Sequence, residues 1–167
     1  MSPQSLKFLF TAIFVLCALA TAAAQGPPAY GPTISLEDAK KAAAQAIAEA
    51  RKNNWTMAVA IVDTAGVLIY YEKMDNTQNG SADVSVNKAR SAARFKRPTK
   101  AFQDALAAGG SRLRILGIEG AVPVEGGLPI VIGGKIVGGI GLSGGSSEQD
   151  GQCAKAGADA LNPPPPK

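Results

Sequence analysis

Two glycine–serine motifs in the last third of the chain have the spacing of known reactive loops. Gly139-x-Gly141-x-x-Gly144 matches the dinucleotide-binding fingerprint, and Gly141-x-Ser143-x-Gly145 matches the turn that presents the nucleophilic serine of α/β hydrolases. The first motif requires another strand after the next helix, whereas this chain soon ends in prolines. The second requires a histidine, and the chain has none. We therefore interpret both motifs as glycine-rich tight turns.

The lack of histidine in 167 residues excludes further chemistry. Serine and cysteine nucleophiles activated by histidine are ruled out, as are zinc sites that need imidazole. No D-x-D-x-D-G loop is present, so calcium binding has little support. Asp63 and Asp150 lie near predicted turns, and we expect them to cap helices or stabilise those turns.

A basic stretch without acids is the clearest candidate for ligand binding. Its members are Lys88, Arg90, Arg94, Lys96, Arg97 and Lys100. They form either a solvated helix face or a patch for an anion. Nucleic acid is a poor candidate because the net charge is only +4 and aromatic residues make up 5% of the chain. Carboxylates of a small ligand fit such a patch better.

Hydrophobic periodicity predicts the elements that must position these residues. The order is a helix, two strands, two helices, one or more strands and a final helix. The predicted ranges are 36–53, 57–63, 67–71, 81–96, 99–107, 128–132, 135–142 and 147–161. Ser35 and Ser147 are the expected N-caps of the first and last helices. Because hairpins pair strands antiparallel, the pattern indicates an α/β sandwich with helices covering the sheet.

Glycines gather in the second half of this pattern. Three of them, Gly138, Gly139 and Gly141, fall inside a predicted strand. A glycine in a strand is destabilising by roughly 0.5–1 kcal/mol relative to alanine. We expect a close approach by a helix, a ligand or another subunit to require them.

The two ends of the chain differ in composition from the rest. Lys7, the apolar run 8–20 and the alanines 22–24 predict a signal peptide over residues 1–24. The run is short for a membrane span, so we expect a secreted or periplasmic protein without stable membrane insertion. Residues 25–33 read as a linker and 162–167 as a proline-rich tail. Cys153, the one cysteine left after cleavage, is either a buried small hydrophobe or an intermolecular or redox thiol.

A series of motifs runs along residues 34–161. It begins with the alanine-rich first helix and continues with Ala60-Ile-Val-Asp63-x-x-Gly66, Lys73-Met74-Asp75, Lys88-Ala89-x-x-Ala92, Phe95-x-x-Pro98-Thr99, Gly126-Gly127-x-Pro129-Ile130 and Gly138-x-Ile140-Gly141-x-Ser143-Gly144, followed by Gln149-Asp150. In this order, the motifs resemble the GlcG/HbpS-like heme-binding family, related to the C-terminal domain of PduO-type proteins.

The resemblance implies a profilin-like α/β sandwich, a central antiparallel sheet flanked by helices, assembled into homo-oligomers from dimers to octamers. It also implies heme as a cofactor or ligand. One relative ligates heme iron through a threonine in the segment matching Pro98-Thr99, and others use histidine. Thr99 is therefore the candidate iron ligand here, with Arg94, Lys96 and Arg97 as partners for the heme propionates.

Tyr70, Tyr71 and Met74 are alternative ligands, although neighbouring strand residues face opposite sides of a sheet. The function implied is a secreted heme- or tetrapyrrole-binding oligomer that captures or transfers heme or releases its iron. The alternative is an accessory protein of the same fold that binds a small molecule other than heme. An enzyme is a third reading, including peroxide-dependent heme degradation.

Overall fold

The structure is a computed structural model that describes residues 26–161. The predicted signal peptide and the proline-rich tail lie outside the described residues. Within the described part, no helix is long and apolar enough to cross a membrane.

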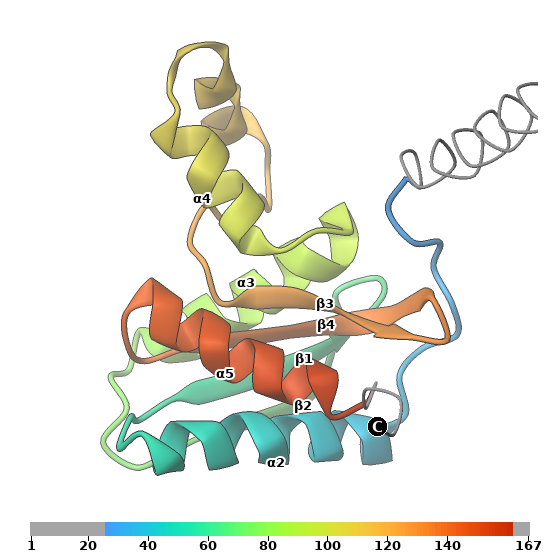
Figure 1. Ribbon diagram of the computed structural model, residues 1–167, viewed down its shortest axis with the longest axis vertical. Coiled ribbons are helices and arrows are strands. Elements are labelled where there is room, and N and C mark those ends of the chain that lie inside the picture. Colours follow the sequence, from blue (N-terminus) through green and yellow to red (C-terminus); the bar gives the residue numbers. More distant parts are fainter. Residues whose placement is uncertain (1–25, 162–167) are drawn as a thin grey trace, which may run out of the picture.

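A four-stranded antiparallel sheet forms the centre of the fold (Figure 1). Its strands are β1 (Ala58–Asp63), β2 (Leu68–Lys73), β3 (Gly127–Ile132) and β4 (Lys135–Ser143), in the order β2-β1-β4-β3. Both predicted hairpins are present, and β1 pairs with β4 to join them. In the β1–β2 turn, Asp63 Oδ1 accepts from Ala65 N at 2.9 Å and from Val67 N at 2.8 Å, which confirms the turn role predicted for Asp63.

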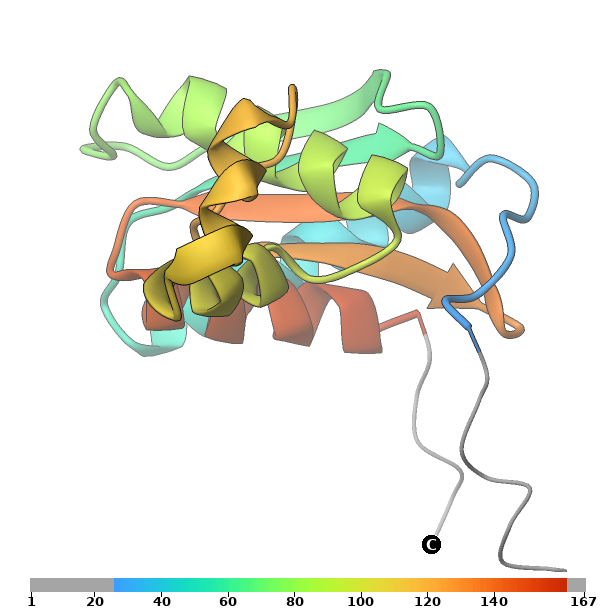
Figure 2. The same cartoon turned by 90° about the horizontal axis from the view of Figure 1, so that it is seen from above.

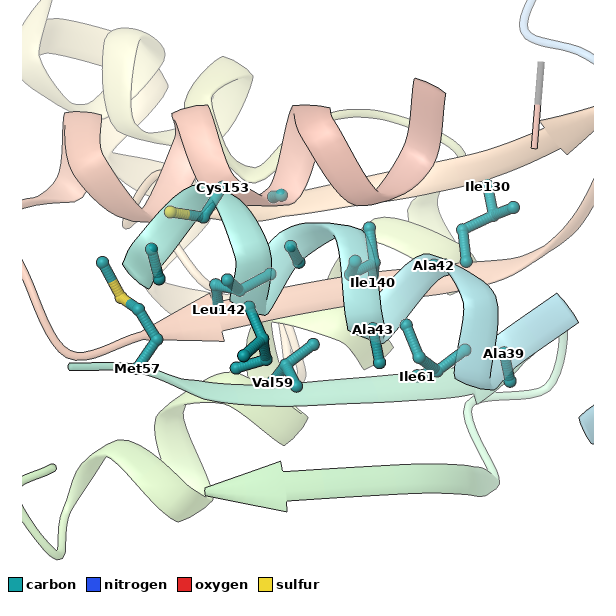
Figure 3. Packing of buried hydrophobic residues seen from close by; sticks show 14 of the residues in the cluster. Ala39, Ala42, Ala43, Met57, Val59, Ile61, Ile130, Ile140, Leu142 and Cys153 are labelled. Carbon is teal, nitrogen blue, oxygen red and sulfur yellow. The ribbon is translucent and has the colours of Figure 1, made fainter. Parts of the chain in front are cut away.

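Two helices cover one face of the sheet, α2 (Leu36–Lys52) and α5 (Ser147–Asp159). Alanines on α2 share one buried apolar cluster with side chains of β1 and β4 (Figure 3). A Cβ added to Gly157 of α5 would lie 2.7 Å from the Ala42 carbonyl oxygen, so the two helices lie close together. Ser35 caps α2 as predicted, since its Oγ accepts from Asp38 N at 3.0 Å. The cap predicted for α5 was wrong by one residue: Ser146, not Ser147, forms the capping box with Gln149.

A single helix, α3 (Ser81–Phe95), covers the other face. A Cβ added to Gly141 would lie 2.5 Å from Ala89 N, and one added to Gly139 would lie 2.5 Å from the Ala89 carbonyl oxygen. Gly139 and Gly141 therefore allow backbone-to-backbone approach by α3, so of the three neighbours expected from the sequence (a helix, a ligand or another subunit) it is a helix that lies there. Gly138 instead lies against the Val62 carbonyl of β1.

The chain between α3 and β3 projects away from the sandwich (Figure 1), and Figure 2 looks down on this projection from above. We call this projection the arm: α4 (Thr99–Ala107), the 3-10 helix η1 (Gly110–Gly117) and the return segment 118–126. The sequence predicted α4 with its bounds, but not η1. The Phe95 and Phe102 rings meet edge to face at 5.4 Å and join the base of the arm to α3.

The segment predicted as a linker is bound to the sandwich through Tyr30. Ala29 and Gly31 exchange backbone hydrogen bonds with Ile136 of β4, and the Tyr30 hydroxyl donates to the carbonyls of Ala93 and Arg94 at 3.0 Å. This segment pairs with β4 beyond Gly138, where the β1 pairing ends.

Cys153 is fully buried between α5 and the sheet, which confirms it as a small core hydrophobe. Burial raises the pKa of its thiol to about 12, with smaller contributions from Glu49 and Asp150. Above about pH 8.5 the Cys153 thiol therefore keeps its proton in the folded protein, whereas it would lose that proton in the unfolded chain. This contribution to stability is complete below that pH and is lost as the pH rises towards 12.

We accordingly expect Cys153 to resist thiol reagents at pH 9 in the folded protein and to react at once in denaturant. Timed labelling with a chromogenic disulfide, with and without denaturant, measures both rates. Equal rates in the two conditions would show that the thiol is accessible in the folded protein.

Candidate functional site

A buried ion pair connects the two helical layers. Lys88 Nζ on α3 lies 2.6 Å from Asp150 Oδ2 on α5, with the two side chains 1% and 4% exposed. The ammonium also donates to the Leu142 carbonyl at 3.1 Å, and Asp150 Oδ1 accepts from Gly145 N at 3.1 Å. Burial raises the pKa of the Asp150 carboxyl, and the Lys88 ammonium opposes this. Lys88 thus belongs to neither the solvated face nor the anion patch considered from the sequence.

The start of β3 runs directly beside this pair, at Gly126 and Gly127. A Cβ on Gly126 would lie 2.8 Å from Lys88 Nζ, and one on Gly127 would lie 2.7 Å from Thr99 Cγ2. Thr99 is itself fully buried, and its Oγ1 accepts from Gly127 N at 2.9 Å. The hydroxyl therefore fixes the base of the arm to β3.

The three cations predicted to bind propionates lie at the end of α3, but they do not converge on Thr99. The Lys96 ammonium sits 4.1 Å above the Tyr30 ring, and the Arg97 guanidinium sits 5.5 Å from the centre of the Phe102 ring. Arg94 is exposed and lines a different surface. Among the described residues, none of the three forms an ion pair with an acid, so their charges are available to an anion.

A pocket of about 530 Å³ opens on the solvent side of α3. Asn87, Arg90 and Arg94 form its helical wall, and residues 119–122 of the arm form the opposite wall. Val122 N donates to Ser91 Oγ at 3.1 Å and holds the two walls together. Arg90 was part of the predicted basic stretch, but Asn87 and Glu119 were missed because their approach depends on how the arm folds back.

The alternative iron ligands lie on opposite sides of the sheet, as strand alternation predicted. Tyr70 packs against the α2–α5 core and donates to Glu72 at 3.0 Å, whereas Tyr71 packs against the α3 side. Met74 is partly buried against the α2–α5 core. Within residues 26–161, no group of three or more metal-ligating acids or cysteines occurs.

A family model described as "Haem degrading protein HbpS-like" matches residues 34–159, the whole sandwich and its arm. The chain belongs to the HbpS-like family. The profilin-like sandwich with a central antiparallel sheet, expected from the resemblance, agrees with this membership. The family and a heme-bound structural neighbour support a function related to heme binding.

Individual relatives extend this family assignment. Protein GlcG of Escherichia coli K12 is 36% identical over 80 residues, which is 46% of this chain and 60% of that protein. A double mutant of Streptomyces reticuli HbpS superposes with a TM-score of 0.72 at 32% identity, covering 84% of this chain and 95% of that one. The PduOC:heme complex superposes with a TM-score of 0.71 at 27% identity, covering 78% and 96%.

The residues of this HbpS-like chain fit heme only in part. The unpaired cations at the end of α3 suit carboxylates such as propionates. Thr99 Oγ1, by contrast, is buried and already hydrogen-bonded to Gly127. As the chain is folded here, that hydroxyl cannot reach an iron atom unless the base of the arm separates from β3.

Proposed function

We propose that this protein binds heme reversibly at the end of α3 for capture, transfer or iron release. The observation that carries the proposal is that Arg94, Lys96 and Arg97, which lie near one another in sequence at the end of α3, form no ion pair with an acid of the described chain, in a protein of the HbpS-like family. The heme bound in the PduOC complex supports the same ligand class.

Weak iron ligation is part of this proposal. A neutral hydroxyl is a poor ligand compared with histidine, cysteine or tyrosinate, and the chain has no histidine. Bound heme would supply iron and peroxide chemistry, while the cations of this chain bind its carboxylates. Affinity based on carboxylates favours release to a partner over permanent retention.

A hemin titration of the protein tests this function. We expect a saturable shift of the Soret band and about tenfold weaker binding in the Arg94→Gln/Arg97→Gln variant, because charge-assisted bonds to the propionates are lost. Arg51→Gln, on α2 across the sheet, is the matched control and should titrate like the wild type. The absence of a saturable shift would favour the accessory protein that binds no heme.

Two substitutions at Thr99 separate iron ligation from the structural role. Thr99→Ser keeps the hydroxyl and should bind hemin like the wild type, whereas Thr99→Val removes it at equal volume. If Thr99 ligates iron, the Soret maximum of Thr99→Val shifts relative to that of Thr99→Ser. Identical spectra at equal saturation would remove Thr99 from the iron site.

We also propose that the protein acts outside the cytoplasm as a homo-oligomer. Lys7 and the apolar run that follows support export, and mass spectrometry of exported protein should find a chain beginning near Gln25.

The homo-oligomer is supported by an apolar surface on the arm that suits a second copy of the chain. Its exposed side chains are Leu113, Leu116 and Ile118, which are 50%, 69% and 40% exposed. Leu116→Glu should reduce the mass measured by light scattering, and an unchanged mass would exclude this surface.

A further inference from the structure

We propose that the pocket between α3 and the arm is a binding site for a small monocarboxylate that carries its own hydrogen-bond donor. This site is separate from the proposed heme function, although Arg94 borders both. The proposal rests on the cations in the pocket, on the turn that positions them and on one acid in the opposite wall.

Arg90 and Arg94 present the recognition groups. The two residues are one helical turn apart on α3, so their side chains extend from the same face. Arg90 Nε donates to the Gly66 carbonyl at 3.0 Å, which leaves its two terminal amino groups for a ligand. Neither guanidinium forms an ion pair with an acid of the described chain. A planar fork of donors binds a carboxylate through two parallel hydrogen bonds.

The β1–β2 turn positions both arginines at Gly66. A Cβ added to Gly66 would lie 3.1 Å from Arg94 Cδ and 3.3 Å from Arg90 Cγ, so both aliphatic stems lie across this glycine. Gly66 has φ +87°, a backbone conformation that favours glycine. The turn therefore fixes the two stems side by side, which lowers the entropy lost when a ligand orders the guanidinium groups.

Glu119 narrows the class of ligand. It lines the pocket opposite the arginines, and Asn87 adds an amide that donates and accepts hydrogen bonds. Two guanidinium groups and one carboxylate leave a local charge of about +1, which one carboxylate neutralises. A second ligand carboxylate would meet Glu119, whereas a hydroxyl could donate to it. The arrangement therefore favours a hydroxylated monocarboxylate over a dicarboxylate.

Lactate, propionate and lactamide test each part of this recognition. Lactate and propionate differ chiefly by one hydroxyl, and lactamide replaces the carboxylate of lactate with a neutral amide. In hemin-free protein followed by amide NMR, we expect lactate to produce saturable shifts at Arg90, Arg94 and Gly120. Propionate should bind more weakly, and lactamide should produce no saturable shift.

Three variants localise the binding. Arg90→Gln/Arg94→Gln should weaken lactate binding about tenfold or more, whereas Arg51→Gln should leave it unchanged. Glu119→Gln should reduce the preference for lactate over propionate while retaining both. Equal binding of lactate and lactamide, or full affinity in the double variant, would overturn the proposal. Because no hemin is present, a negative heme titration would not affect this result.

Discussion

Asp150→Ala is expected to destabilise the protein by about 3–5 kcal/mol, because it leaves the Lys88 ammonium buried without its counter-ion. The ammonium is 1% exposed and would retain one hydrogen bond, to the Leu142 carbonyl. The same substitution removes the acceptor for Gly145 N at the start of α5. For a domain of this size, the loss corresponds to a fall in melting temperature of roughly 10–17 °C.

Chemical denaturation of a double-mutant cycle isolates the pair. Lys88→Met/Asp150→Ala removes both charges, so it should be more stable than the sum of the two single losses predicts. Asp104→Ala provides the matched control, because Asp104 pairs with Lys100 at 2.7 Å on an exposed helix face. The Asp104→Ala substitution should lower the free energy of unfolding by less than about 1 kcal/mol. A similar loss for Asp150→Ala and Asp104→Ala would show that burial of the pair contributes little.

Gly141→Ala is expected to destabilise the protein by about 3 kcal/mol or more, at the upper end of the range for overpacked cores. The new methyl group would lie 2.5 Å from Ala89 N and still closer to the Ser85 carbonyl. Both neighbours are backbone atoms of α3, so no side-chain rotation relieves the contact. The helix must move away from β4, which would loosen the packing of Ala89 and Ala93.

Gly117→Ala is the control for this substitution. Nothing lies within 4 Å of a Cβ added to Gly117, so its denaturation midpoint should stay close to that of the wild type. Near-ultraviolet circular dichroism should report altered packing in Gly141→Ala alone. Two variants of equal stability would mean that α3 can move from β4 at little cost.

The elements of the sandwich could be predicted because local signals mark them. Ser35 caps α2, Pro98 separates α3 from α4, and Gly133-Gly134 joins β3 to β4. The glycines of β4 could also be recognised as positions of close approach, although composition alone could not identify α3 as the neighbour. The element that escaped prediction, η1, begins at Gly110, where the positive φ values of Gly109 and Gly110 interrupt the helical pattern.

The candidate site was less predictable because its contacts join residues far apart in sequence. Lys88 and Asp150 are 62 positions apart, and Lys88 stands among cations that are exposed or half-buried. No local pattern distinguishes it from Arg90 or Arg94. The same applies to Thr99, whose hydrogen bond to Gly127 depends on the path of the arm. The basic composition of α3 indicated a site for an anionic ligand, but only the tertiary structure shows where each charge lies.

The attachment of Tyr30 has a consequence for the order of folding. Its hydroxyl partner at Ala93 is 63 residues away, and the backbone partner of its neighbours, Ile136, lies still further along the chain. These contacts close long loops, whereas the β1–β2 and β3–β4 hairpins close short ones. The β1–β4 pairing that joins the two hairpins also closes a long loop, so the segment around Tyr30 would dock after the hairpins have formed. It would also detach first, in a local opening that leaves the sandwich folded.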